Sequence, residues 1–187
     1  YVAFLRAINI GSRRIKMADL RDLYIELGYA EAATYIASGN VIFDSPVRPD
    51  IRRLEDAFEP AFGFRSEVFL RSEDEIRGLL GRIPWSDDEG VIDVSLLETI
   101  PDPDSARALE AMAVPPEDLV VTETEVWSLR VGGGAPSTHK ESTSIKVLGM
   151  KMTRRGLNTI RKINGRFLSD PSSQSRAVAQ RDSGVDL

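Results

Sequence analysis

The sequence contains no cysteine and a single histidine, His139. Without cysteine the chain has no disulfide, no thiolate zinc site and no cysteine nucleophile. One histidine cannot form a multi-histidine metal site, and any triad of serine, histidine and an acid would have to use it. We predict no metal and no cofactor. We assign no catalytic residue, because no acid–base pair occurs at a diagnostic spacing.

Long hydrophobic runs are also absent. No apolar stretch approaches the ~20 residues that a membrane span requires, and no charged and then apolar leader with a small-residue cleavage site is present. These features predict a cytoplasmic protein with no membrane partner. Hydrophobic residues make up 42% of the 187 residues, which is enough for a sizeable core in one domain or two small ones.

The net charge of −5 conceals an uneven distribution. Residues 140–166 contain eight basic side chains and one acid, whereas residues 86–126 contain twelve acids and one arginine. These blocks could pair with each other, or the basic segment could present a positive surface to an anionic partner. The consecutive acids at 87–89 lie in a predicted turn, where carboxylates are normally solvated rather than bound to a metal.

The first half of the chain predicts the order strand, helix, hairpin, helix, strand. Apolar residues occupy both faces of residues 1–11 when these are read with a period of two, which indicates a central strand covered on both sides. The other elements are expected at 17–28, around a Gly-Asn turn in 34–43, at 49–62 and at 66–71. This order favours a ferredoxin-like unit, in which two helices back an antiparallel sheet.

A similar order follows in the second half, after a third helix that starts at Ser72 with a capping box. The expected elements are a strand at 91–100, a helix at 104–113, a hairpin within 119–131, a helix at 140–148 and a basic helix at 153–164. We therefore predict an α+β fold made of two ferredoxin-like βαββα(β) halves, with antiparallel sheets backed by helices.

The polar run at 86–90 is the most plausible boundary between these halves. We predict an N-terminal half over 1–84, a C-terminal half over 85–168 with a basic terminal helix, and a flexible tail over 169–187.

Arg6 interrupts the apolar pattern of the first strand. Its neighbours Phe4 and Ile8 are apolar, so we expect a largely buried guanidinium that binds a carboxylate, a backbone carbonyl or an anionic ligand. Asn9 lies at the end of the same strand and is expected beside it.

The basic helix expected at 153–164 offers a second cationic group. On a helix, Arg154 lies one turn from Asn158 and Arg155 lies one turn from Thr159, which gives two adjacent pairs of arginine and polar side chains. Such a patch suits recognition of phosphate or carboxylate, although a solvated face paired with the acidic segment would look the same. The glycine-containing loop 132–142 precedes a helix but lacks the spacing of a phosphate-binding P-loop.

Three segments carry a resemblance to a known family. Residues 1–11 (YVAFLRAINIG), 35–43 (YIASGNVIF) and 153–160 (TRRGLNTI) together resemble domain-of-unknown-function family 1697, a group of bacterial proteins. The family pattern usually has Gly where this chain has Ala7, and Asn-Trp where it has Gly156 and Leu157. The resemblance implies an α+β fold and no established activity.

Our leading hypothesis is binding of an anionic, phosphate-bearing ligand, either a nucleotide or a nucleic acid. The candidate ligand-binding residues are Arg6, Asn9, Ser38, Asn40, Arg154, Arg155, Asn158 and Thr159. The alternatives are an enzyme that acts on a small anionic substrate through His139 or a serine, and a structural or self-association module such as a homodimer.

Overall fold

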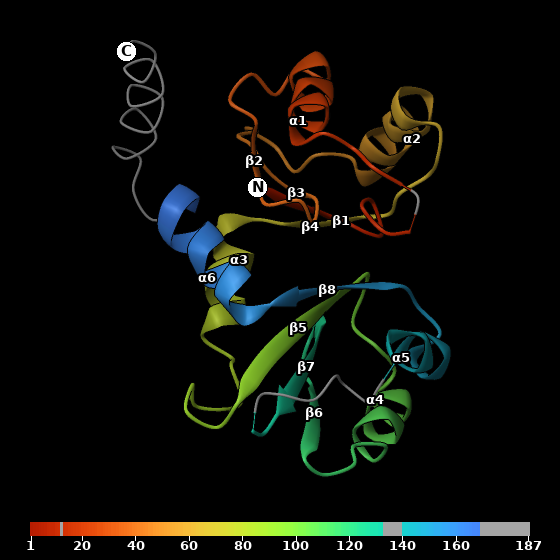
Figure 1. Cartoon of the computed structure of the whole chain (residues 1–187), viewed down its shortest axis with the longest axis vertical. Helices are drawn as coiled ribbons and strands as arrows, with labels where there is room; N and C mark the ends of the chain where they lie inside the picture. Colours follow the sequence, from red (N-terminus) through yellow and green to blue (C-terminus); the bar gives the residue numbers. More distant parts are fainter. Residues whose placement is uncertain (12, 133–139, 169–187) are drawn as a thin grey trace.

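The protein consists of two four-stranded antiparallel sheets, each covered by helices (Figure 1). The fold is taken from a computed structural model that describes residues 1–11, 13–132 and 140–168. The predicted α+β fold with two ferredoxin-like halves is confirmed. The first half contains β1 (Val2–Leu5), α1 (Met17–Glu26), β2 (Ala33–Tyr35), β3 (Asn40–Ile42), α2 (Ile51–Phe62), β4 (Val68–Arg71) and α3 (Glu73–Leu80).

The second half repeats this series. It contains β5 (Val91–Leu97), α4 (Pro103–Glu110), β6 (Glu117–Val121), β7 (Glu125–Arg130), α5 (Glu141–Leu148), β8 (Met152–Gly156), α6 (Leu157–Ile163) and a π-helical turn at Asn164–Leu168. The strand orders are β2-β3-β1-β4 and β6-β7-β5-β8, so corresponding strands occupy corresponding places.

Three apolar cores hold these elements together. Helices α1 and α2 cover the outer face of the first sheet, and α4 and α5 cover the outer face of the second. The inner faces of both sheets share a third core with α3 and α6, which lie between the sheets at one side (Figure 1). Because β1 contributes Val2 and Phe4 to the shared core and Ala3 and Leu5 to the outer one, its apolar residues are buried on both faces.

The strand registers align the two halves residue by residue. Val2 pairs with Ile42 and Arg71, and Val94 pairs with Trp127 and Arg155. Aligning Val2 with Val94 therefore aligns Arg71 of β4 with Arg155 of β8. The chain thus resembles an isologous dimer fused into one polypeptide, in which each half offers the same positions to the other.

The first strand is shorter than we predicted from its apolar pattern. It ends at Leu5, before Arg6, and Ala7 has a positive φ of 56° that extended backbone does not adopt. The chain turns there, so Ile8 returns to the outer core while Ile10 is 66% exposed. Arg6 consequently lies at the end of the strand rather than within it, while its side chain is only 28% exposed and pairs with carboxylates, as expected.

The predicted basic helix at 153–164 was wrong in its first turn. Residues Met152–Gly156 form β8, which pairs with β5 through five residues, and α6 begins only at Leu157. The spacing of the arginines and the polar residues one turn later favoured a helix, but this segment forms the edge strand of the second sheet. Arg154 and Arg155 therefore point to opposite faces of a strand, and the expected helical pairs with Asn158 and Thr159 do not form.

The chain passes from the first sheet to the second in the segment between α3 and β5, where we placed the boundary at residues 84 and 85. That division and the character of the tail remain predictions, and the tail, 169–187, lies outside the described residues. None of the helices in the described part of the chain is both long enough and apolar enough to cross a lipid bilayer.

Candidate functional site

Arg155 is a buried connection between the two halves. It extends from β8 into the first half and is 6% exposed. Burial lowers the pKa of Arg155 to about 10, with the negative charge of Glu141 opposing the shift, so the group stays charged at neutral pH. Its Nε donates to Asn40 Oδ1 (2.6 Å), Nη1 to Thr153 Oγ1 (2.9 Å) and Arg154 O (2.8 Å), and Nη2 to Leu5 O (2.9 Å), Ser38 O (2.8 Å) and Gly39 O (3.2 Å).

Arg71 makes the reciprocal connection from β4. Its Nη2 donates to the carbonyls of Leu97 (2.9 Å) and Thr124 (3.3 Å), at the end of β5 and just before β7. Arg155 reaches the aligned places in the first half, which are Leu5 and Gly39. Each half therefore inserts one arginine into the strand ends of the other, and we call this pair the arginine clasp.

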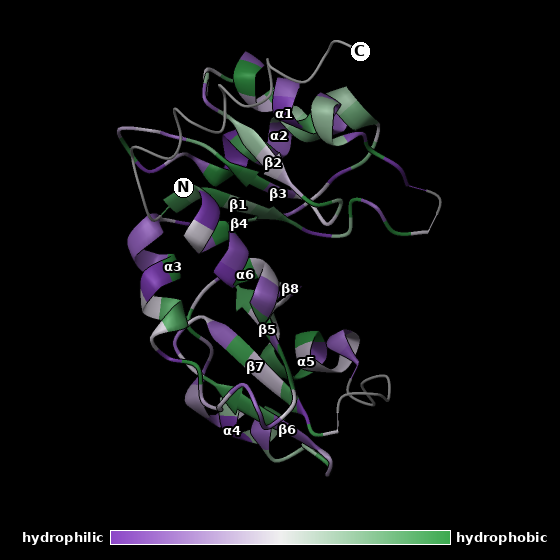
Figure 2. Ribbon diagram, turned by 60° about the vertical axis from the view of Figure 1, so that its left-hand side comes forward, coloured by the Kyte–Doolittle hydropathy of each residue, from purple (hydrophilic) through white to green (hydrophobic). Residues whose placement is uncertain are grey.

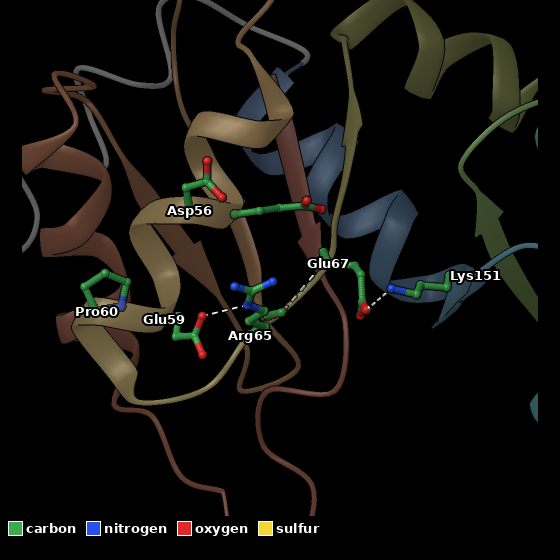
Figure 3. Close-up of a pocket in the computed structure, with 8 residues that line it drawn as sticks. Asp56, Glu59, Pro60, Arg65, Glu67 and Lys151 are labelled. Atoms are coloured by element: carbon green, nitrogen blue, oxygen red, sulfur yellow. Dashed lines mark hydrogen bonds and ion pairs between the residues drawn. The ribbon is translucent and has the colours of Figure 1, made fainter.

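Glu67 joins the halves on the surface beside the clasp. It pairs with Arg6 of its own half (3.3 Å) and with Lys151 of the second half (2.5 Å), as Figure 3 shows for Lys151. Glu67 directly precedes β4 and Lys151 directly precedes β8, so the two residues occupy corresponding positions in the two halves. Corresponding positions also contact each other in an isologous interface.

Acid should weaken this surface contact. Burial would raise the pKa of Glu67, but hydrogen bonds from Lys151 and Arg6 outweigh it, so that its pKa lies below the ordinary value of 4.5. A carboxyl group with a depressed pKa stabilises the fold above its unfolded pKa, and this contribution disappears as the pH falls through the folded pKa. We expect the Glu67→Gln variant to lose less stability than wild type between neutral pH and ~pH 3, measured by urea unfolding.

The control for this experiment is Glu26→Gln, which removes an exposed carboxylate from α1. It should show the pH dependence of the wild type. If Glu67→Gln and wild type lost the same stability on acidification, the ion pairs of Glu67 would not be the source of the acid sensitivity.

A cleft of about 280 Å³ lies between the halves, above the clasp. Three segments and one helix start form it: the turn after β1, the turn between β2 and β3, strand β8, and the first residue of α5. We call it the interhalf cleft. Its lining residues are Leu5, Arg6, Ala7, Ile8, Asn9, Ile10, Ala37, Ser38, Glu141, Thr153, Arg154 and Arg155.

The backbone around the interhalf cleft is strained. Among the described residues, Ala7 (φ 56°) and Ile36 (φ 50°) are the two non-glycine positions with a positive φ. This conformation is unfavourable for any residue with a side chain and especially for β-branched isoleucine. Ala7 lines the cleft, and Ile36 directly precedes Ala37, which also lines it. Strain of this kind concentrates at functional sites, where surrounding contacts hold it in place.

Three arginines line the interhalf cleft, and Arg155 among them donates its hydrogen bonds to the clasp. Arg6 is balanced by Glu67 (3.3 Å) and by Glu141 (3.6 Å). Within the described residues no carboxylate pairs with Arg154, and its Nε is buried without a hydrogen-bond partner. Arg6 Nε is likewise buried without a hydrogen-bond partner, so Arg154 is distinguished by its lack of a carboxylate partner among the described residues, which leaves its charge less neutralised than that of Arg6.

The structure gathers six of the eight predicted residues at or beneath the interhalf cleft, with different roles. Asn9 and Asn40 are occupied by the scaffold: Asn9 donates to Ala37 O (2.8 Å) and accepts from Ile15 N (2.7 Å), and Asn40 binds Arg155. Ser38 contributes its carbonyl to the same arginine. Only Arg6 and Arg154 keep guanidinium groups that face the cleft without being fully committed to protein acceptors.

Two predicted residues lie elsewhere. Asn158 is exposed beside Arg161 in a separate hollow near the start of β5, and Thr159 follows it on α6. Arg161 pairs there with Asp87 (2.7 Å), so part of the basic segment does pair with the acidic one. His139 and most of the glycine loop lie outside the described residues. Within the described residues, no cluster of three or more acids or histidines could hold a metal.

Sequence reasoning missed Arg71, Glu67 and Glu141. Arg71 comes directly after a run of apolar strand residues, as Arg6 does. This similarity is the signal in the sequence that could have identified Arg71. Nothing in local spacing marks Glu67 or Glu141, because each acts on residues more than 60 positions away.

Comparisons with known proteins agree with this architecture. A family model described as "Protein of unknown function (DUF1697)" matches residues 1–127. The chain is similar to a solved structure described as that of the conserved bacterial protein SP0830 from Streptococcus pneumoniae. The TM-score is 0.64 at 23% sequence identity, covering 88% of this chain and 96% of that one, a likeness of fold alone. No sequence among the curated proteins matches the chain.

Proposed function

Because this chain belongs to the DUF1697 family, whose description assigns no activity, we propose its function from the interhalf cleft: the protein binds an anionic, phosphate-bearing ligand there. The observation that carries this proposal is Arg154, which lines the cleft and has no carboxylate partner among the described residues. Arg6 lines the same cleft but pairs with Glu67 and Glu141, so it adds a second, partly neutralised guanidinium group to the site. Guanidinium groups bind phosphate oxygens through short, charge-assisted hydrogen bonds.

The volume of the cleft and the net charge of the protein favour a small ligand, of nucleotide size or less, over a nucleic acid. The cleft measures about 280 Å³, and Glu141, one of its lining residues, would repel an extended phosphate chain. The net charge of −5 also opposes the approach of a long polyanion.

Calorimetric titration tests this proposal. The probes are inorganic phosphate, pyrophosphate, adenosine monophosphate and a short RNA, each at low and at moderate salt. We expect salt-sensitive binding of at least one small phosphate compound. Arg154→Gln should weaken that binding by about tenfold or more, because a charge-assisted hydrogen bond contributes roughly 1.5 to 3 kcal/mol.

The matched control is Arg52→Gln, which removes the same charge from an exposed position on α2. It should leave the affinity within about twofold of wild type, since a distant exposed charge is largely screened. If both variants lost the same affinity, the effect of Arg154→Gln would come from the change in net charge and not from a contact with the ligand. If none of the four probes binds with salt sensitivity, the proposed function is wrong.

A further inference from the structure

The first half lines the interhalf cleft mainly with apolar side chains. Its contribution comes from the turn after β1 and from the turn between β2 and β3. Figure 2 shows β1, which leads into the first of these turns, in green along its length. The apolar lining residues from this half are Leu5, Ala7, Ile8, Ile10 and Ala37. Among the described residues that line the cleft none is aromatic, so this wall is aliphatic.

Two residues of this aliphatic wall are open to solvent. Ile10 is 66% exposed and Ala37 is also exposed, whereas Leu5 and Ile8 are almost completely buried. A single exposed isoleucine is ordinary on a protein surface. Ile10, however, lines the same cleft as Arg154, so a ligand that binds the arginine can also cover the isoleucine.

Hydrogen bonds hold Ile10 and Ala37 at the cleft. Asn9 donates to Ala37 O (2.8 Å) and accepts from Ile15 N (2.7 Å), which ties the turn after β1 to the turn between β2 and β3. Arg13 N donates to Ile10 O (3.2 Å) and closes the first of these turns. The backbone of both exposed apolar residues is therefore fixed without a ligand. Such preorganisation reduces the entropy that is lost on binding.

The uncharged polar side chains of the cleft are already hydrogen-bonded to the protein. Asn9 joins the two turns, Ser38 Oγ accepts from Asn40 Nδ2 (3.0 Å), and Thr153 Oγ1 accepts from Arg155 Nη1 (2.9 Å). Hydroxyl groups of a ligand would compete with these contacts. An aliphatic group needs no hydrogen-bond partner, and it gains free energy by covering apolar surface.

Arg154 determines the anionic part of the ligand. The register that aligns Val2 with Val94 places Arg154 where the first half has Leu70, which is 1% exposed in the outer core. The first half therefore shows that this position of the fold accepts an apolar residue, so packing does not require the arginine. A guanidinium group that lines a cleft is well suited to two oxygens of one phosphate group.

We infer that the ligand is a phosphate monoester of a short aliphatic chain, whose phosphate binds Arg154 while its chain covers Ala7, Ile10 and Ala37. This inference rests on the proposed function and names its ligand class. The cleft measures about 280 Å³, below the range of about 300 to 1,000 Å³ that is typical of small-molecule pockets, so the chain is short. Phospholipids share this chemistry, but their two long chains exceed the cleft, so a free molecule is the expected ligand.

Titration calorimetry with methyl phosphate, butyl phosphate and glycerol 3-phosphate tests the ligand class on the full chain. All three are phosphate monoesters, and glycerol 3-phosphate resembles butyl phosphate in length but carries hydroxyl groups. We expect butyl phosphate to bind at least about tenfold more tightly than methyl phosphate, because each buried methylene group contributes up to about fourfold in affinity. Glycerol 3-phosphate should bind within about threefold of methyl phosphate, since its hydroxyl groups only exchange water for protein partners.

Ile10→Ser tests the aliphatic wall directly. It should remove most of the preference for butyl over methyl phosphate while leaving the affinity for methyl phosphate unchanged. Ile100→Ser is the matched control, because Ile100 is 70% exposed and is not among the residues that line the cleft. It should change neither affinity.

Ala7→Gly makes the test independent of a single isoleucine. Ala7 has a φ of 56°, which glycine adopts without strain, so this variant should fold. It removes one methyl group from the wall and should reduce the preference for butyl phosphate by about twofold to fourfold.

The outcomes separate the ligand class from the proposed function. If methyl phosphate binds but butyl phosphate binds no more tightly, or if glycerol 3-phosphate binds most tightly, the ligand class is wrong and the proposed function stands. Equal losses of butyl phosphate affinity in Ile10→Ser and Ile100→Ser would also overturn the ligand class. So would binding to vesicles of phosphatidylcholine and phosphatidic acid without binding of free butyl phosphate. If no phosphate compound binds, the proposed function and the ligand class fail together.

Discussion

Replacing Arg155 with methionine is expected to destabilise the protein by about 3 to 5 kcal/mol, because a buried hydrogen-bonding hub is removed and its acceptors remain. Nε and both terminal nitrogens of the side chain donate hydrogen bonds. Methionine fills a similar volume but leaves Asn40 Oδ1 and the carbonyls of Leu5 and Ser38 without these donors. Urea unfolding at neutral pH gives the free energy directly.

The matched control is the adjacent arginine. Arg154→Met removes the same charge from the opposite face of β8, where Nε has no partner among the described residues. It should cost no stability. A loss in Arg155→Met that is no larger than in Arg154→Met would show that the clasp does not hold the halves together. Arg155→Lys should recover only a small part of the loss, because an ammonium group cannot reproduce the planar set of donors.

Replacing Arg71 with methionine is the second large expected effect, about 2 to 4 kcal/mol, since Arg71 is buried and bridges the halves in the reverse direction. Burial lowers the pKa of Arg71, and the charge of Glu125 opposes this shift. The loss should be smaller than for Arg155, because Arg71 Nε already lacks a partner while Nε of Arg155 has one. Urea unfolding again measures it.

Arg77→Met serves as the control for Arg71. Arg77 lies on α3 and its side chain is 54% exposed, so its ion pairs are screened and we expect a change below about 1 kcal/mol. The double variant Arg71→Met, Arg155→Met tests the pairing of the clasp itself. If both arginines hold the same interface, the two losses should not add, because the first opening already exposes the second site. Strict additivity would mean that each arginine stabilises only its own surroundings.

Helical spacing predicted α1 and α2, a capping box predicted α5, and apolar or β-rich runs predicted seven of the eight strands, because local patterns reflect which face is buried. The same reasoning failed at Arg154 and Arg155. Their spacing with Asn158 and Thr159 fits a helix. In the structure, however, residues 152–156 form a strand that pairs with β5.

The site shows a similar division. Arg6, Arg154 and Ser38 do line one cleft, but Arg6 is not inside a strand and Arg154 is not on a helix, although the sequence predicts both. The sequence predicts Asn40 and Arg155 as ligand contacts, whereas in the structure Arg155 Nε donates to Asn40 Oδ1 at 2.6 Å. A buried cation in a sequence indicates that a partner exists but does not say whether that partner is protein or ligand.

By itself the sequence determined the βαββαβ order of the first half and the βαββα order of the second, the apolar faces of β1 and the need of Arg6 for a partner, because these depend on neighbours within a few residues. The tertiary structure alone decided the arginine clasp, the register that aligns the halves, and the contrast between Leu70 and Arg154 at one shared position. Arg155 and Leu5 are 150 residues apart and meet only after both sheets have formed, so no local pattern encodes their contact.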